Sequence, residues 1–226
     1  MNSMEILEKK EKEEINFYRD FWKHYIELEK LFLETEKYVA IDNSNRKTYS
    51  LQYSILLQAI CGEIDVVIKR FIYEYDNHIV VKNMEDYVSF LYNHNTGLEN
   101  EVAFLDDYNL DFQPWKSIGF RNVNGENRLI CPKWWSEYNS IKHRRITFEK
   151  QNNEFKIIEK NIKHANQENV LNALAALFIL EKQCLILMRK RFNDLLSQIN
   201  SQDSVEITNR FNDSIFQNVI ETITVI

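Results

Sequence analysis

The sequence predicts an all-α protein, an antiparallel bundle of long helices with one irregular insertion. Only four of its 226 residues are glycine and two are proline. That is too few for glycine-rich phosphate loops, Rossmann turns or a many-turned β sandwich, which need glycine at special backbone angles. Apolar residues recur at steps of three and four along three long segments. We therefore expect one domain over residues 1–226, with little or no sheet beyond a small hairpin in the insertion.

The first expected helix covers residues 4–38. Its apolar side chains recur at helical spacing at Ile15, Tyr18, Phe21, Trp22, Tyr25, Leu28, Leu31 and Phe32. Residues 1–14, which include "EKKEKEE", have no apolar stripe and are expected to be exposed, charged helical turns that project into solvent. The polar stretch "DNSNRKT" ends the element.

Two further helices are expected before the insertion. Residues 50–75 place one broad apolar face at Leu51, Ile55, Leu56, Ala59, Ile60, Ile64, Val67, Ile68 and Phe71. Within this segment, Asp65 and Lys69 have the i,i+4 spacing of a helical ion pair. Asn83 has the chemistry of an N-cap for a shorter helix that ends near Tyr92, before "NHNTG".

Residues 99–133 break the helical pattern and form the insertion. The Asn124-Gly125 pair predicts a hairpin or a longer irregular excursion, and Pro132 suits the first turn of the helix that follows. The last long helix is expected to begin at an Asn166 N-cap. Its segment Val170–Leu180 is apolar nearly all round, so it should be the most buried part of the chain. Residues 197–226 form a C-terminal extension whose pattern suits either a short helix or a strand.

The compartment and cofactor signals are mostly negative. No signal peptide and no run of about eighteen apolar residues is evident, so a cytoplasmic protein is expected. Three widely spaced cysteines, Cys61, Cys131 and Cys184, are expected to be buried, reduced thiols. The histidines show no metal-ligand spacing with another His, Cys or carboxylate, so no metal and no cofactor is predicted: His24, His78, His94, His143 and His164.

The stretch "WWSEYNSIKHRR", residues 134–145, is the candidate functional motif. On a helix, Ser136, Asn139, Ser140 and His143 share a polar stripe, and Trp134, Tyr138, Ile141 and Arg145 share a more apolar one. Residues 116–145 hold seven cations against Glu126 and Glu137, whereas residues 99–111 hold five acids and no cation. Such local polarisation allows a phosphate-binding face in a chain whose net charge is -6.

Each feature of the motif also has a purely structural interpretation. Trp134 and Trp135 suit core or interface packing as well as base stacking. His143 suits a hydrogen-bonded structural role, and the Lys-His-Arg-Arg run suits a solvated helix end. The residues alone leave these alternatives open.

Three segments together resemble the HEPN superfamily: "EIDVVIK", "WWSEYNSIKHRR" and "ANQENVLNALAALFIL". The resemblance covers about residues 50–188 and is greatest to an uncharacterised bacterial and phage-associated branch with a Trp-Trp-x-x-Tyr-Asn-x-x-Lys-His motif. It implies a small antiparallel HEPN-like bundle, usually a homodimer. Many family members are metal-independent RNases of toxin–antitoxin, anti-phage defence or RNA-processing systems, and others are inactive binding modules.

The resemblance also implies roles for individual residues. The family signature is an arginine followed after four to six residues by a histidine, often with a polar residue after the arginine. Asn139 and His143 match the polar residue and the histidine, and Tyr138 occupies the arginine position. The implied catalytic candidates are therefore His143, Asn139 and Tyr138. The implied RNA- and phosphate-binding candidates are Lys142, Arg144 and Arg145.

Tyr138 departs from the family pattern in charge. A tyrosine donates one hydrogen bond but carries no positive charge at neutral pH, so one of the three neighbouring cations would have to replace the arginine. Histidine titrates near neutral pH and can act as acid or base. Two functions follow: a metal-independent endoribonuclease, or an inactive module that binds RNA or a protein. The expected partners are RNA, a second copy of the chain, and an antitoxin or other protein, with no membrane.

Overall fold

The computed structural model describes residues 2–123, 125–151, 154–199 and 214–218. The helices are α1 (Ser3–Phe17), α2 (Lys23–Leu33), α3 (Leu51–Tyr75), α4 (Met84–Asn93), α5 (Lys133–Arg144) and α6 (Gln167–Gln198). The strands are β1 (Ala103–Leu105), β2 (Leu110–Phe112), β3 (Gly119–Val123), β4 (Glu126–Ile130), β5 (Ile146–Gln151), β6 (Glu154–Lys160) and β7 (Gln217–Asn218). The described chain is mostly helical, which confirms the predicted helical character.

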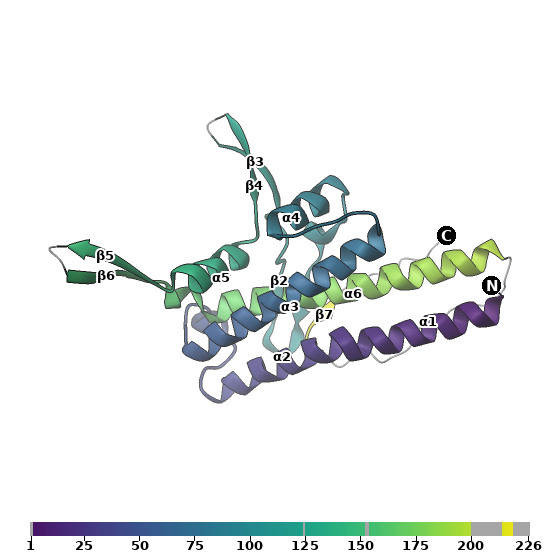
Figure 1. The fold of residues 1–226 in the computed structure, drawn as a ribbon. Helices are drawn as coiled ribbons and strands as arrows, with labels where there is room; N and C mark the ends of the chain where they lie inside the picture. Colours follow the sequence, from purple (N-terminus) through teal and green to yellow (C-terminus); the bar gives the residue numbers. More distant parts are fainter. Residues whose placement is uncertain (1, 124, 152–153, 200–213, 219–226) are drawn as a thin grey trace.

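Helix α6 lies at the centre of the bundle, with α3 along one side and the continuous α1–α2 rod along another (Figure 1). A π-helical segment, Tyr18–Trp22, joins α1 to α2 without a break in the rod. Nearly every side chain in Val170–Leu180 is fully buried, as the sequence predicts. By length and hydropathy α6 could also cross a bilayer, but 72% of its apolar window is buried inside the protein, as in the core helix of a globular fold.

Side-chain caps begin three of the helices, at Asn83 and Asn166, which were predicted as caps, and at Ser50, which was not. Asn83 Oδ1 accepts from the Asp86 amide at 3.1 Å, and Asn166 Oδ1 accepts from the Asn169 amide at 3.0 Å. Ser50 Oγ accepts from the Tyr53 amide at 3.0 Å. Each cap satisfies one of the amides that the first helical turn leaves without a backbone partner.

The buried face of α3 is narrower than the predicted one. Leu51 is 72% exposed and Ile55 is 61% exposed, although both belong to the expected apolar face. The core receives other members of that face, Leu56, Ile60, Ile64, Val67 and Ile68, as predicted, because α3 turns these side chains toward α6 and α2. A nearly continuous apolar helix does not specify which side will be covered, so its packing partners decide. The outward residues form what we call the α3 stripe: Leu51, Ile55, Ala59, Gly62 and Val66.

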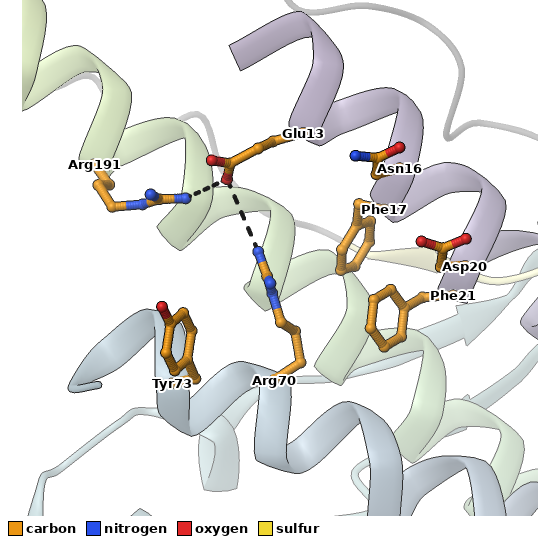
Figure 2. A pocket seen from close by; sticks show the side chains of 8 residues that line it. All are labelled: Glu13, Asn16, Phe17, Asp20, Phe21, Arg70, Tyr73 and Arg191. Atoms are coloured by element: carbon orange, nitrogen blue, oxygen red, sulfur yellow. Dashed lines mark hydrogen bonds and ion pairs between the residues drawn. The ribbon is translucent and has the colours of Figure 1, made fainter. Parts of the chain in front are cut away.

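Of the segment predicted to project into solvent, residues 1–14, the described residues 2–14 do so on one face only, which corrects the prediction. Ile6, Lys10 and Glu14 are buried, and Glu14 pairs with Arg189 of α6 at 2.8 Å. Glu13 lies between Arg191 of α6, at 2.6 Å, and Arg70 of α3, at 4.0 Å (Figure 2). Two cations near the end of α6, Arg189 and Arg191, therefore form ion pairs with α1.

Three small antiparallel sheets interrupt the helices, so the expectation of at most one hairpin was wrong. Strands β3 and β4 form the hairpin predicted at Asn124-Gly125. Gly125 has φ +86°, in the left-handed region, and Asn124 lies outside the described residues. The second sheet has the strand order β2-β1-β7, in which a short piece of the C-terminal extension pairs with β1. The third, the β5–β6 hairpin, was not expected, and it projects from the end of α5 (Figure 1).

A buried carboxyl interrupts the apolar surface of α6. Glu181 has no exposed surface, and neither of its carboxyl oxygens has a hydrogen-bond partner among the described residues. Burial raises the pKa of this carboxyl well above its usual value, and the nearby Glu63 carboxylate raises it further. Glu63 in turn lies 3.4 Å from Nδ1 of His24, a mostly exposed side chain. Glu181 is therefore held in its neutral form, since a lone charge would be strongly disfavoured there.

We expect the Glu181→Gln substitution to stabilise the protein at pH 8 by about 1–3 kcal/mol and to have little effect near pH 4. The native pKa is raised, so stability is fully present below the unfolded value, about 4.3, and falls as pH rises above it. Urea unfolding at both pH values measures the difference. Glu11→Gln, at an exposed position of α1, is the matched control and should change little. An equal effect of Glu181→Gln at both pH values would contradict the neutral carboxyl.

Candidate nucleic-acid interface

Helix α5 carries the motif and lies between two projecting hairpins, with β4 leading into it and β5 leaving it (Figure 1). Trp134 holds the helix to the body. Its side chain is 2% exposed, its Nε1 donates to the Pro114 carbonyl at 3.0 Å, and its ring meets Trp115 edge-on at 5.4 Å. The packing interpretation of Trp134 is therefore correct, and this side chain presents no surface for a base.

Tyr138 and Asn139 face different depressions although they are neighbours in sequence. Tyr138 is 7% exposed, packs 5.0 Å from the Trp135 ring, and lines a depression with Cys61, Gly62 and Asp65 of α3. Asn139 lines an adjacent depression with Asn83, Glu85 and Cys131. Trp135 borders both depressions. Tyr138 and Asn139 thus do not line a common depression.

Asn139 and His143 lie one turn apart on the polar stripe, as the sequence predicts. Asn139 is half-buried and His143 is exposed. Within the described residues, neither side chain makes a hydrogen bond or an ion pair, so both groups are available to a ligand. The other two members of the stripe bond within the helix: Ser140 Oγ donates to the Ser136 carbonyl at 3.2 Å, and Ser136 Oγ to that of Pro132 at 3.5 Å.

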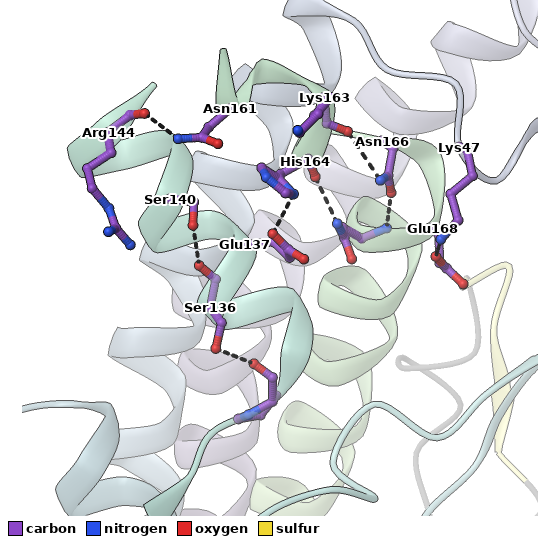
Figure 3. A network of polar contacts seen from close by, with 12 residues as sticks. Lys47, Ser136, Glu137, Ser140, Arg144, Asn161, Lys163, His164, Asn166 and Glu168 are labelled. Atoms are coloured by element: carbon purple, nitrogen blue, oxygen red, sulfur yellow. Dashed lines mark hydrogen bonds and ion pairs between the residues drawn. The ribbon is translucent and has the colours of Figure 1, made fainter. Parts of the chain in front are cut away.

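A different histidine holds α5 in place. His164 Nδ1 lies 2.5 Å from Glu137 Oε2, which joins α5 to the 3₁₀ turn Asn161–His164 (Figure 3). Asn161, which is buried, donates from Nδ2 to the Arg144 carbonyl at 2.6 Å and from its backbone N to the Arg145 carbonyl at 2.9 Å. These bonds satisfy carbonyls that a helix end leaves open. Neither anchor was predicted from the sequence, because the partners are far apart in the chain and show no local spacing signal.

Anchoring of the helix end leaves its cations exposed. The side chains of Lys142, Arg144 and Arg145 all face solvent, and Lys142 Nζ lies 5.5 Å from the centroid of the Tyr138 ring. The Arg144 and Arg145 backbone is fixed while the guanidinium groups remain free to meet a ligand. The three predicted phosphate-binding residues therefore lie together at the C-terminal end of α5.

The two hairpins extend this positive charge beyond the helix. The exposed cations of this region, which we call the basic surface, are Arg121, Arg128, Lys133, Lys142, Arg144, Arg145, Lys150, Lys156 and Lys160. Residues 116–163 hold eleven Lys and Arg and five Glu, which gives this segment a net charge of +6. Because the whole chain has a net charge of -6, the remaining residues together carry -12. A phosphate chain would be attracted to this region and repelled by the remainder.

The β5–β6 part of this surface was overlooked in the sequence, although a signal was present. Apolar Ile146 and Phe148 alternate with Thr147 and Glu149, which is the period-two pattern of a half-covered strand. A second alternating run follows an Asn-Asn pair at residues 152–153, which lies outside the described residues. The two runs are short and directly follow the helical motif, so the change from helical to period-two spacing is a weak signal.

Other parts of the described chain offer weaker sites. The pocket in Figure 2 contains Arg70 and Arg191, but Glu13 and Glu74 pair with both guanidinium groups and Asp20 adds a further negative charge. This pocket therefore does not favour an anion. Among the described residues, no group of three or more His, Cys, Asp or Glu side chains is arranged to hold a metal ion. All three cysteines are free thiols; Cys61 and Cys184 are buried, whereas Cys131, which was also expected to be buried, is only half-buried.

Comparison of the chain with protein-family models, with curated proteins and with solved structures returned no match.

Proposed function

We propose that this protein binds RNA through the basic surface of α5 and its two flanking hairpins. The observation that carries the proposal is the separation of charge, +6 in residues 116–163 and -12 elsewhere, with the cations exposed on three neighbouring elements. Lysine and arginine side chains on such a surface bind phosphates and release counterions from the nucleic acid. A simple solvated helix end would have exposed cations on α5 alone. The exposed cations lie on three elements, which argues against that interpretation.

The resemblance to the HEPN superfamily supports the same class of ligand. On this interpretation α5 is the motif helix of a HEPN-like bundle, and its basic end binds RNA. A protein partner such as an antitoxin would have to present a strongly acidic surface to α5. RNA is the simpler partner for a surface whose cations lie on both the helix and the hairpins, because phosphates repeat along the whole strand.

Metal-independent cleavage of the bound RNA is a second candidate function. The exposed, unbonded His143 one turn from Asn139 favours it, because an imidazole in that position can take the proton of a ribose 2′-hydroxyl. The oxygen then attacks the adjacent phosphorus, the bond from phosphorus to the 5′-oxygen breaks, and this oxygen takes a proton from solvent water, so the product ends in a 2′,3′-cyclic phosphate. Tyr138 is buried and uncharged, so Arg144, Arg145 or Lys142 would stabilise the phosphate charge, and Asn139 would position the substrate.

A second copy of the chain would complete such a site by adding another histidine and further cations. The α3 stripe is a suitable surface for that copy, since Leu51, Ile55 and Val66 are 72%, 61% and 50% exposed. A Cβ at Gly62 would meet no atom within 4 Å, so nothing inside the protomer requires glycine at this helical position. Glycine in a helix costs about 1 kcal/mol and allows another backbone to approach closely. Gly62 borders the same depression as Tyr138 and Lys142, so the copy would lie beside α5.

Removal of two cations from α5 tests the binding proposal. The Arg144→Ala/Arg145→Ala double variant should weaken RNA binding about tenfold or more near physiological salt. It should also flatten the dependence of log affinity on log salt by about 1.4 for a single strand. Fluorescence anisotropy at several salt concentrations measures both effects. The charge-matched control, Lys9→Ala/Lys12→Ala on exposed positions of α1, should leave both unchanged. Equal losses in the two double variants would point to net charge alone and remove the α5 site.

Cleavage is tested separately at the histidine. If the second function holds, His143→Ala should lower the cleavage rate at least about a hundredfold while RNA binding and the unfolding midpoint stay unchanged. Wild-type products formed in the presence of a chelator should carry a 2′,3′-cyclic phosphate, detectable by mass spectrometry. His78→Ala, at another exposed histidine, is the control. Binding without any cleavage by the wild type would leave the inactive RNA-binding module as the function.

Charge on the α3 stripe tests the homodimer. Ile55→Glu/Val66→Glu should convert a dimer to a monomer in multi-angle light scattering, because two carboxylates would be buried without partners at a contact between copies. Both positions are exposed in the protomer, so the double substitution should change the unfolding midpoint of the protomer only slightly. A wild-type monomer at working concentration, or a dimer unaffected by the double variant, would exclude this interface.

A further inference from the structure

The β5–β6 hairpin has one apolar face and one acidic face. Residues paired across two strands share a face, and faces alternate along each strand. The register pairs Phe148 with Ile157, Lys150 with Phe155, and Ile146 with Lys160. The opposite face receives the pairs Thr147–Glu159 and Glu149–Lys156. The register shifts by one residue between the pairs formed by Thr147 and Phe148, because β6 has one extra residue at this point. Strand β5 is regular there, so both face assignments stand.

Nothing in the described part of the chain covers the apolar face. Phe155 is 75% exposed, Phe148 56%, Ile157 49% and Ile146 43%, and every residue of β6 is exposed. A two-stranded hairpin by itself is at best marginally stable in water. A contiguous apolar surface on such an element is unusual unless a partner meets it. The hairpin therefore has the features of a binding element.

Charge on the hairpin indicates the chemistry of that partner. Lys150 and Lys160 lie on the apolar face, whereas all three acids of the hairpin, Glu149, Glu154 and Glu159, lie on the other. The apolar face is thus both aromatic and basic, and it begins directly after Arg144 and Arg145. A ligand suited to it offers flat apolar groups joined by negative charges.

We infer that this face, the β5–β6 platform of Phe148, Phe155, Lys150 and Lys160, binds single-stranded RNA by stacking bases on its two rings. Phe148 and Phe155 are diagonal neighbours on one face, about 7–8 Å apart at the backbone, so each ring can receive one base while the lysines meet phosphates. Duplex RNA does not fit as well, because its bases are already stacked on one another and present no free ring face. The inference rests on the proposed RNA binding and adds that the bound RNA is single-stranded.

The test removes the two aromatic rings but keeps apolar side chains at both positions. Phe148→Leu/Phe155→Leu keeps hydrophobic side chains and loses the rings, so binding of fluorescein-labelled oligouridine should weaken about tenfold with an unchanged salt slope. Binding of a duplex of the same length should not change. Lys150→Ala should weaken oligouridine binding and flatten its salt slope by about 0.7, whereas Lys9→Ala, the control at an exposed position of α1, should leave both unchanged. Circular dichroism checks that each variant is folded.

The outcomes separate this inference from the proposed function. If Phe148→Leu/Phe155→Leu binds oligouridine as the wild type does while Arg144→Ala/Arg145→Ala does not, the platform is excluded and the α5 site stands. If the wild type binds neither RNA, the proposed function and the platform both fall. A third assay uses vesicles that contain phosphatidylserine. If the wild type and the leucine variant bind them equally and neither prefers oligouridine, the face is a membrane contact and the inference is overturned.

Discussion

The fold depends on the burial of α6 between α3 and the α1–α2 rod. Each large apolar side chain in Val170–Leu180 that leaves water contributes about 1.5–3 kcal/mol, and almost all are fully buried. No other helix in the described chain has a stretch as completely buried as Val170–Leu180, so the remaining elements pack around α6. Even the ion pairs of Arg189 and Arg191 hold α1 against this helix. The buried Glu181 is the exception to its apolar character, and it reduces the stability that the helix would otherwise provide.

The candidate interface depends on this core through a small number of anchors. Trp134 reaches the Pro114 carbonyl and Trp115, and Trp115 in turn lies against α6, where its Nε1 approaches the Ala176 carbonyl at 3.4 Å. Asn161 holds the last turn of α5, and the Glu137–His164 pair holds an earlier turn of the same helix. A rigid helix with its polar bonds satisfied from behind can present cations outward at fixed positions. Loose attachment would spread the same charges over many arrangements and weaken any specific contact.

Local chemistry explains the parts of the site that were predicted. Helical periodicity places Asn139 and His143 on one face whatever surrounds them, and the Lys-His-Arg-Arg run is too polar to be buried without partners. Tyr138 was predicted as a site residue on family resemblance, yet its ring packs on Trp135 and is nearly covered. Its neighbours on α3 are some seventy residues away in sequence, and only their approach decides whether a tyrosine at this position is exposed.

The sequence by itself determined the helices, their capping residues, the Asn-Gly hairpin, and which helix is central, because these follow from contacts within a few residues or from an apolar surface that must be covered. Tertiary structure alone decided which side of α3 faces solvent, where Glu13 and Glu14 find their arginines, and which histidine is bound and which is free. It also decided that the β5–β6 hairpin stands uncovered beside α5. Those outcomes depend on contacts between distant segments, and such contacts arise only when whole elements compete for the same core surface.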